Sequence, residues 1–383
     1  MKNHQFLIFF SIVFTVYFLG NLYIFIKGYN SLSWARENRI LYFTAFILLA
    51  SMFVTGKILE TNHSSVFSDI LNIAGGFWLA FMLYAFLFLL FTDITVLILK
   101  LTGVIGREAL PEIRRWSFIG TTALSVVLIA AGFINAVSPK VTEYNVTIGK
   151  KTDGVDHLRI VAVSDIHLGS IIRKRSIRKL SAMMHELKPE AVFLLGDIVD
   201  GEIGPVLRGD LLKYFDPPES VDGLFAITGN HEFIGKAERT IPYIESHGIR
   251  VLKDEMEVLP GGIQLFGRLD RDSRWHNSAE RLTLEEIMKN ADRSRPLIVL
   301  DHQPVKLEEA EKAGVDLQLS GHTHNGQFWP LNLITKRMYE VSYGYLRKGN
   351  SQFIVSSGFG LWGPRVRSGS RPEVLLINVS FSN

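Results

Sequence analysis

Hydrophobic positions are distributed unevenly along this chain of 383 residues. Residues 1–137 are strongly apolar and carry few charges, whereas the remainder alternates short apolar runs with polar segments. The first pattern is typical of membrane helices and the second of a soluble α/β domain. The pattern therefore predicts an apolar domain over 1–137, a linker and first strand over 138–157, and an α/β domain over 158–383.

The apolar domain contains four segments that are long enough to cross a bilayer, which requires about 20 mainly apolar residues in a helix. They cover residues 5–26, 40–59, 73–92 and 117–137, and we expect an all-α bundle of four transmembrane helices. The third could continue to Leu99, past Asp93. The first could instead be a signal peptide. Its length, the lack of a convincing cleavage site and the three following spans favour a membrane helix.

Basic residues in the short loops predict the orientation of these spans. The loop after the first span and the loop after the third are basic, with Lys27, Arg36 and Arg39 in one and Lys100, Arg107, Arg114 and Arg115 in the other. Both loops lie on one side, which the positive-inside rule assigns to the cytoplasm. We therefore expect an integral protein of the plasma membrane or bacterial inner membrane, with its α/β domain on the extracytoplasmic side. The lysines at 140, 150 and 151 oppose this orientation.

Composition excludes some classes of function. The formal net charge of +3 gives no reason to expect nucleic acid as a partner. The chain has no cysteine, which rules out disulfides and thiolate metal ligands. Polar residues within the spans lie near their ends, so we expect the bundle to anchor the protein rather than to form a transport path.

Within the α/β domain, apolar runs alternate with helical patterns. We expect strands at 141–148, 158–164, 191–195, 224–228, 250–252, 263–266, 297–300, 317–319, 353–355 and 374–379, and helices at 176–187, 237–247, 284–290 and 305–313. This alternation predicts an α/β fold with sheets covered by helices on both faces.

Five of the expected strands lead into Asp, Asn or His. The segments that follow them read DIHLGS, GDIVD, GNHE, DHQP and GHTH. Each segment alone has an ordinary explanation as a helix cap, a turn or a loop. Together they deliver polar side chains to the carboxyl ends of strands, where α/β sheets bind ligands. The resulting candidates are Asp165, His167, Asp197, Asn230, His231, His302, His322 and His324.

Carboxylate, amide and imidazole ligands without a thiolate suit divalent Mn, Fe or Zn. Seven of these eight candidates, with His231 left aside, are too many ligands for one ion but suitable for two, provided that one carboxylate is shared. We therefore expect two divalent metal ions in one site.

These five segments, in this order, resemble the calcineurin-like metallophosphoesterase family, and the resemblance runs from about Leu158 to the C-terminus. It implies an α/β fold, a four-layer αββα sandwich. It also implies the roles of the site residues: Asp165, His167 and His324 would hold one ion, Asn230, His302 and His322 the other, and Asp197 would bridge them. His231 would donate a proton or contact phosphate. Asp200, Glu232 and Asp301 would support ligands or simply be solvated.

The resemblance implies a phosphoesterase in which metal-bound hydroxide attacks a phosphate ester in line, and the four spans, which the resemblance does not cover, would anchor it in a membrane. His231 would protonate the leaving oxygen. We expect a phosphodiester, such as a phospholipid, a lipid-linked envelope intermediate or a soluble nucleotide. A phosphomonoesterase, including a phosphoprotein phosphatase, is the alternative enzyme. An inactive metal-binding sensor or scaffold module is the alternative of another class.

Two basic segments could contact the substrate. IIRKRSIRKL follows the first motif, and GLWGPRVRSGSR lies near the C-terminus. From these segments we select Arg173, Arg175, Arg365 and Arg367. The first segment could equally be a solvated helix face, or could bind an anionic head group at the membrane surface. Phe328 and Trp329, after the last motif, could form a wall of the site or belong to the core.

Overall fold

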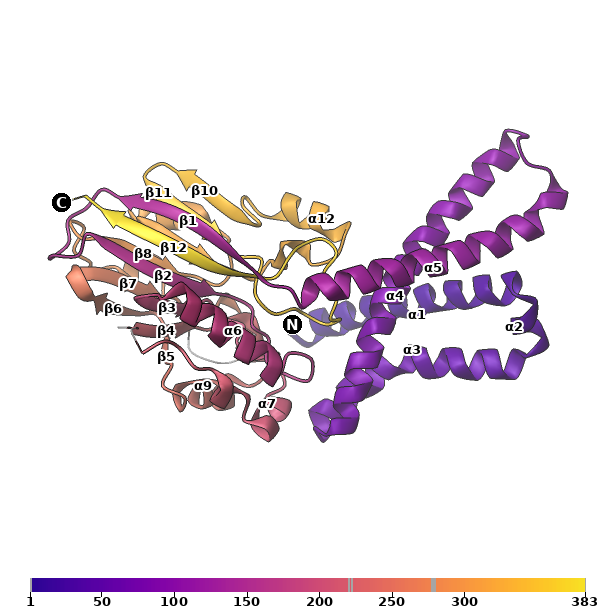
Figure 1. Ribbon diagram of the computed structural model, residues 1–383, viewed down its shortest axis with the longest axis horizontal. Helices are drawn as coiled ribbons and strands as arrows, with labels where there is room; N and C mark the ends of the chain where they lie inside the picture. Colours follow the sequence, from indigo (N-terminus) through magenta and orange to yellow (C-terminus); the bar gives the residue numbers. More distant parts are fainter. Residues whose placement is uncertain (1, 220, 222, 277–279, 383) are drawn as a thin grey trace. The chain divides into compact units, whose positions relative to one another are not determined.

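The computed structural model describes residues 2–219, 221, 223–276 and 280–382. The chain forms two compact units, one ending at Gly132 and the other beginning at Phe133. Figure 1 shows their helices and strands. The boundary falls inside the last long helix, α5 (Leu110–Ala136), so the second unit includes the final turn of that helix.

The first unit is helical. It contains α1 (Lys2–Ser31), the short α2 (Ser33–Glu37), α3 (Arg39–Asn62), α4 (Val66–Leu101) and most of α5. Four helices are long and apolar enough to cross a membrane, which confirms the expected transmembrane bundle. The third is longer than the expected 73–92 at both ends, because it begins at Val66 and the helix continues through Asp93. Its carboxylate pairs with Lys27 Nζ at 2.5 Å and accepts a hydrogen bond from Tyr23.

Packing in this unit is that of a membrane bundle. Large apolar side chains such as Phe18, Phe43 and Val127 are exposed, as is required of surfaces that face lipid. Close contact between α3 and α4 depends on Gly75, where any Cβ would collide with the backbone of Phe53. Small residues at helix contacts are typical of membrane proteins, because there packing rather than water exclusion holds helices together.

The second unit contains two sheets of six strands each. The order of the first sheet is β1 (Lys140–Ile148), β12 (Glu373–Phe381), β2 (His157–Val163), β3 (Ala191–Leu194), β4 (Gly223–Ile227) and β5 (Arg250–Leu252). The order of the second is β10 (Gly344–Lys348), β11 (Ser351–Val355), β9 (Leu317–Ser320), β8 (Leu297–Leu300), β7 (Ile263–Gly267) and β6 (Glu255–Leu259).

Strand direction brings the motif-bearing ends together within each sheet. β2, β3, β4 and β5 run parallel, and so do β7, β8, β9 and β11. β12 is antiparallel to β2, while β6 and β10 are antiparallel edge strands. The carboxyl ends of β2, β3 and β4 therefore share one edge of the first sheet, and those of β8 and β9 share one edge of the second.

Apolar side chains divide the unit into four layers. One buried cluster joins the facing sheets, with Ile160 and Phe193 from the first and Leu265 and Ile298 from the second. Two further clusters pack helices outside the sheets. They involve α6 (Lys174–Leu187) and α9 (Ala237–Glu245) over the first sheet, and α10 (Leu284–Ile287) and α11 (Leu307–Lys312) over the second. The expected αββα sandwich is confirmed.

The helix α6 shows how the sequence selects these layers. Ile177, Leu180, Ser181 and Met184 are its buried positions, a spacing that places them on one helix face against the first sheet. The helix ends where Lys188 adopts a left-handed conformation just before Pro189, which cannot continue it. The opposite face, which carries Lys174 and Arg178, faces solvent.

Candidate metal centre

The polar residues after β2, β3, β4, β8 and β9 meet at the strand ends. Backbone hydrogen bonds connect the loops directly: the N–H of Asp165 donates to Gly196 at 3.1 Å, and the N–H of His167 donates to Asp197 at 2.9 Å. In the second sheet, the N–H of Gly321 donates to the carbonyl of His302 at 2.9 Å. The loops are thus held by one another as well as by the strands.

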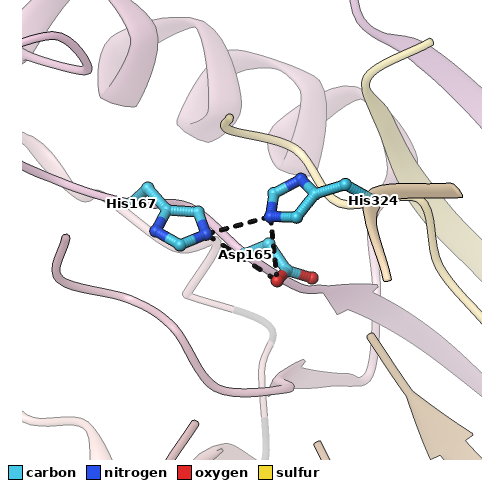
Figure 2. Close-up of side chains that lie close together, drawn as sticks. All are labelled: Asp165, His167 and His324. Carbon is cyan, nitrogen blue, oxygen red and sulfur yellow. Dashed lines mark hydrogen bonds and ion pairs between the residues drawn. The ribbon is translucent and has the colours of Figure 1, made fainter. Parts of the chain in front are cut away.

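A first cluster consists of Asp165, His167 and His324 (Figure 2). The Nε2 atoms of the two histidines lie 3.0 Å apart, and Asp165 Oδ1 lies 3.3 Å from His324 Nε2. Two ligands about 2.1 Å from one ion and at right angles to each other are about 3 Å apart. The three buried side chains therefore converge with the spacing of a shared cation.

A second cluster consists of Asp197, His302 and His322, with Asn230 beside them. His302 Nε2 lies 3.2 Å from Asp197 Oδ2, and Asn230 Oδ1 lies 3.0 Å from His322 Nδ1. His302 Nδ1 donates to the carbonyl of Leu195 at 2.7 Å, which leaves its Nε2 as the possible ligand atom. Burial, followed by the positive charge of His302, lowers the pKa of His322 to about 4 and keeps that ring neutral.

Asp197 lies close to both clusters. Its Oδ2 atom is 3.2 Å from His302 in the second cluster and 3.8 Å from His167 in the first. Its Oδ1 atom accepts the backbone N–H of His231 at 2.9 Å. Burial opposes its ionisation, but the surrounding histidines, His302 foremost, hold the pKa of Asp197 far below its usual value. It is thus an ionised carboxylate placed between two groups of ligands.

The backbone at this centre is strained. Asp165, His167, Asp197, His322 and His324 all have φ between 46° and 70°. A left-handed conformation costs a residue other than glycine on the order of 1–3 kcal/mol. Five of the seven expected ligands therefore occupy positions that local propensity disfavours, as is typical of sites where the fold is constrained by function.

Two glycines permit the loops to approach. A Cβ at Gly321 would overlap Ser164 and reach Asp165, and a Cβ at Gly229 would overlap the carboxylate of Asp197. These glycines belong to the GHTH and GNHE motifs, so the motif glycines are needed for close contact between loops.

Glu232 holds two of the ligand loops together. It is buried, and its carboxylate accepts backbone hydrogen bonds from Ile198 and Val199 through Oε1, and from Asp197 and Gly229 through Oε2. Burial, followed by the nearby charge of Asp197, raises the pKa of Glu232 to about 7. The sequence identified this residue only as a supporting or solvated group; the structure gives it four donors from the loops after β3 and β4.

Asp200 lies between two histidines. Its Oδ1 atom is 3.4 Å from Nδ1 of His167 and 3.3 Å from Nδ1 of His231, so one carboxylate lies beside both rings. The ring of His231 lies edge-on to that of His167, with centroids 4.5 Å apart.

Asp301 has a different environment from Asp200. It forms a buried ion pair with Arg281 and Arg268, at 2.5 and 3.4 Å, and supports the neighbouring loop.

Arg367 supports His324 from behind. It is fully buried and donates to His324 Nδ1 at 2.9 Å, to Gly360 O at 2.6 Å and to Ser357 O at 2.8 Å. Because a guanidinium can only donate, Arg367 holds the ring at Nδ1, and Nε2 faces Asp165 and His167 in the first cluster. Burial, with the positive charge of Arg367, keeps the pKa of His324 well below its usual value.

Replacing Arg367 with lysine should weaken metal binding by about 10–100-fold. An ammonium keeps the positive charge but cannot reproduce the planar set of guanidinium N–H donors that orients His324. The Mn²⁺ concentration for half-maximal activity measures this effect. Arg371→Lys, on an exposed arginine of the same segment, is the control and should leave that concentration unchanged. An unchanged Mn²⁺ requirement in Arg367→Lys would show that Arg367 does not orient a ligand.

A cavity of about 350 Å³ opens beside these residues. It is lined by Asp197, Asn230, His231, His322 and His324 and by an apolar wall that includes Phe328, Leu331 and Trp362. Trp329 is about half exposed and does not line it. Phe328 is buried and lines it, so it is both core and wall.

The four basic candidates occupy different places. Arg367 is buried behind His324, whereas Arg175 and Arg365 line a separate cavity. Arg173 precedes the first turn of α6. None of the four lines the cavity beside the clusters, and their contact with substrate stays a prediction.

The clusters fit divalent metal ions. Asp165 Oδ1 and His302 Nε2 are buried without hydrogen bonds, although each lies within 3.3 Å of an oppositely charged or polar group. Burying such atoms is costly unless a further partner is present. The donors are imidazole nitrogen, carboxylate and amide oxygen, which bind Mn, Fe or Zn. Asp165, His167, Asp197, Asn230, His302, His322 and His324 are the residues that would hold the ions.

Comparison with known proteins agrees with this chemistry. A family model described as calcineurin-like phosphoesterase matches residues 158–326. An uncharacterized metallophosphoesterase of Helicobacter pylori is 30% identical over 255 residues, covering 66% of this chain and 67% of that protein. An uncharacterized metallophosphoesterase of Campylobacter jejuni is 28% identical and covers 98% of both chains. A transmembrane protein with metallophosphoesterase domain from Danio rerio is 28% identical, covering 66% of this chain and 60% of that protein.

Proposed function

This chain belongs to the calcineurin-like metallophosphoesterase family, and on that basis we propose that it is a membrane-anchored phosphodiesterase with two divalent ions in its catalytic centre. Membership makes the chain a metal-dependent phosphoesterase, and its four apolar helices make it a membrane protein. The observation that carries the proposed two-ion centre is the position of Asp197 Oδ2, within 3.8 Å of a histidine in each cluster.

Each protein group has a part in the proposed reaction. Two divalent ions, when bound, would neutralise phosphate charge and make a water molecule acidic enough to attack near neutral pH. His231 lines the cavity beside Asn230 and is the candidate general acid for the leaving oxygen. Asp200 Oδ1 lies 3.3 Å from Nδ1 of the His231 ring, where it would orient the ring. The loops are fixed beforehand by Glu232 and Arg367, so little reorganisation is needed when substrate binds.

The apolar wall favours a diester. The cavity that the metal-ligand candidates line is also lined by Phe328, Leu331 and Trp362. A diester carries two substituents on phosphorus, so one could lie against this apolar wall while the phosphate lies against the polar residues. The substrate would then be a phosphodiester with an apolar or ring-bearing group, a description that lipid and nucleotide esters both fit.

The full-length, metal-reconstituted protein is expected to hydrolyse bis(p-nitrophenyl) phosphate with at least about tenfold higher kcat/KM than p-nitrophenyl phosphate, a difference of about 1.4 kcal/mol in transition-state binding. Trp362→Ala, which removes part of the apolar wall, should lower the ratio of kcat/KM for the diester to kcat/KM for the monoester. The main cause should be a higher KM for the diester. A higher kcat/KM for the monoester would replace the proposal with a phosphomonoesterase. No hydrolysis of either ester with metal bound would favour the inactive module.

The basic loops after the first and third spans support an extracytoplasmic catalytic domain. Alkaline phosphatase fused after Asn383 should therefore be active in intact cells, whereas a cytoplasm-dependent fluorescent protein at the same position should be dark. The reverse pair of results would place the domain in the cytoplasm.

A further inference from the structure

A second cavity, of about 320 Å³, lies within the catalytic unit and is lined by none of the expected metal ligands. Three cationic side chains line it, from Arg175, Lys179 and Arg365. Apolar residues, among them Phe133 and Phe359, form the rest of its wall. Its volume is in the range of sites for small ligands.

The positive charge of this cavity is not balanced locally. Among the residues that the structure describes, none of those lining the cavity carries a carboxylate. Arg365 Nε is buried and has no hydrogen-bond partner in the described chain, and a second guanidinium nitrogen is 3.4 Å from the Ser176 hydroxyl. Burial, followed by the charge of Arg175, lowers the pKa of Arg365. A cavity with these properties favours an anion.

Arg365 contrasts with its near neighbour Arg367. Arg367 donates hydrogen bonds to His324 and to two backbone carbonyls, whereas the one hydrogen bond of Arg365 within the described residues is the long one to Ser176. The two arginines therefore have different functions. Arg367 orients His324 in the candidate metal centre, whereas Arg365 is available to a ligand in the second cavity.

The cavity lies at the C-terminal end of the last apolar span. Phe133 and Ala136 both line it and belong to the last turn of α5, the helix whose apolar span ends at Ala136. Lys179 Nζ donates to the carbonyl of Val137 at 2.9 Å, and the Arg365 guanidinium lies 5.9 Å from the centre of the Phe133 ring. Basic side chains next to the end of a membrane helix are attracted to anionic lipid head groups.

We propose that this cavity binds the phosphate group of an anionic phospholipid, gripped by Arg175 and Arg365, with the lipid's glycerol and upper acyl carbons against Phe133. Arginine suits this ligand because its fork donates two hydrogen bonds to one phosphate. The inference goes beyond the proposed phosphodiesterase activity, because the site lies apart from the metal-ligand candidates and needs no ion.

The test uses the full-length protein in a zwitterionic detergent with EDTA present, so that binding is measured without turnover. The probes are dioctanoyl phosphatidylglycerol, dioctanoyl phosphatidylcholine and inorganic phosphate. The variant R175Q/R365Q removes two charges from the cavity. The matched control K174Q/R178Q removes two charges from α6, the helix that also carries Arg175. Both of these side chains lie over the ring of Tyr214, and neither lines either of the two cavities described above.

Wild type and K174Q/R178Q should bind phosphatidylglycerol equally well and phosphatidylcholine weakly, and R175Q/R365Q should bind phosphatidylglycerol about tenfold or more weakly. If the double variant does not fold, the exposed substitution Arg175→Gln alone should weaken binding about threefold. Equal phosphatidylglycerol binding by all folded variants would overturn the proposal. Inorganic phosphate binding at this site as tightly as the lipid would overturn it in favour of a free anion. Because the readout is binding in EDTA, neither outcome bears on the proposed hydrolysis.

Discussion

Replacing Asp197 with asparagine is expected to lower kcat/KM for bis(p-nitrophenyl) phosphate by more than about a hundredfold. Residues that only orient a metal ligand typically cost up to about a hundredfold when they are replaced, and a ligand itself should cost more. Asp197 faces His302 at 3.2 Å and His167 at 3.8 Å, so one substitution removes negative charge from both clusters. An amide also binds divalent ions more weakly than a carboxylate does.

Two measurements separate this loss from unfolding. Metal content per chain should fall together with activity, while the melting temperature changes little, because the amide oxygen can still accept the N–H of His231. Asp216→Asn, on a side chain that is 81% exposed, is the matched loss of a carboxylate and should leave both quantities at the wild-type level. Full activity in Asp197→Asn would remove this residue from the catalytic centre.

Replacing Glu232 with glutamine is expected to reduce stability as well as activity. Each carboxylate oxygen accepts two backbone N–H groups, so an amide nitrogen at either position leaves two buried donors unpaired. Each unpaired donor costs about 1–3 kcal/mol. For a unit of this size a total of about 4 kcal/mol corresponds to a fall in melting temperature of roughly 10 °C.

Activity should fall in Glu232→Gln even at temperatures where the protein stays folded, because Glu232 connects the loops that carry Asp197 and Asn230. Thermal unfolding and ester hydrolysis on the same samples test both effects. Glu245→Gln, on an exposed glutamate of α9, is the control. A melting temperature within about 2 °C of wild type would show that the four hydrogen bonds contribute little.

The sequence predicted the layers and most of the strands because burial leaves a clear trace. The runs at 160–163, 191–195 and 297–300 are apolar on both faces, as strands between two layers must be. The edge strands β6 and β10 were missed because their exposed positions interrupt the apolar pattern. The division into two sheets is set by pairings such as β2 with β12, between residues far apart in the chain.

The motifs predicted which side chains gather at the strand ends, but not what holds them there. Nothing in the sequence shows that Arg367 donates to His324, because the two residues lie 43 positions apart. The position of Glu232 two residues after Asn230 did mark it as a possible supporting residue. The hydrogen bonds that it accepts from the backbone of the loop after β3 could not be predicted from that position. The left-handed backbone at Asp165 and His167 contradicts local propensity and results from contacts between loops.

The central claim is that these strand ends hold two divalent ions that carry out phosphoester hydrolysis. Its most direct test measures metal per chain and hydrolysis of bis(p-nitrophenyl) phosphate on one preparation of the full-length protein, before and after EDTA and after addition of Mn²⁺. We expect about two ions per chain, loss of hydrolysis with EDTA and its return with Mn²⁺. Hydrolysis that persists undiminished after the ions have been removed would contradict the account.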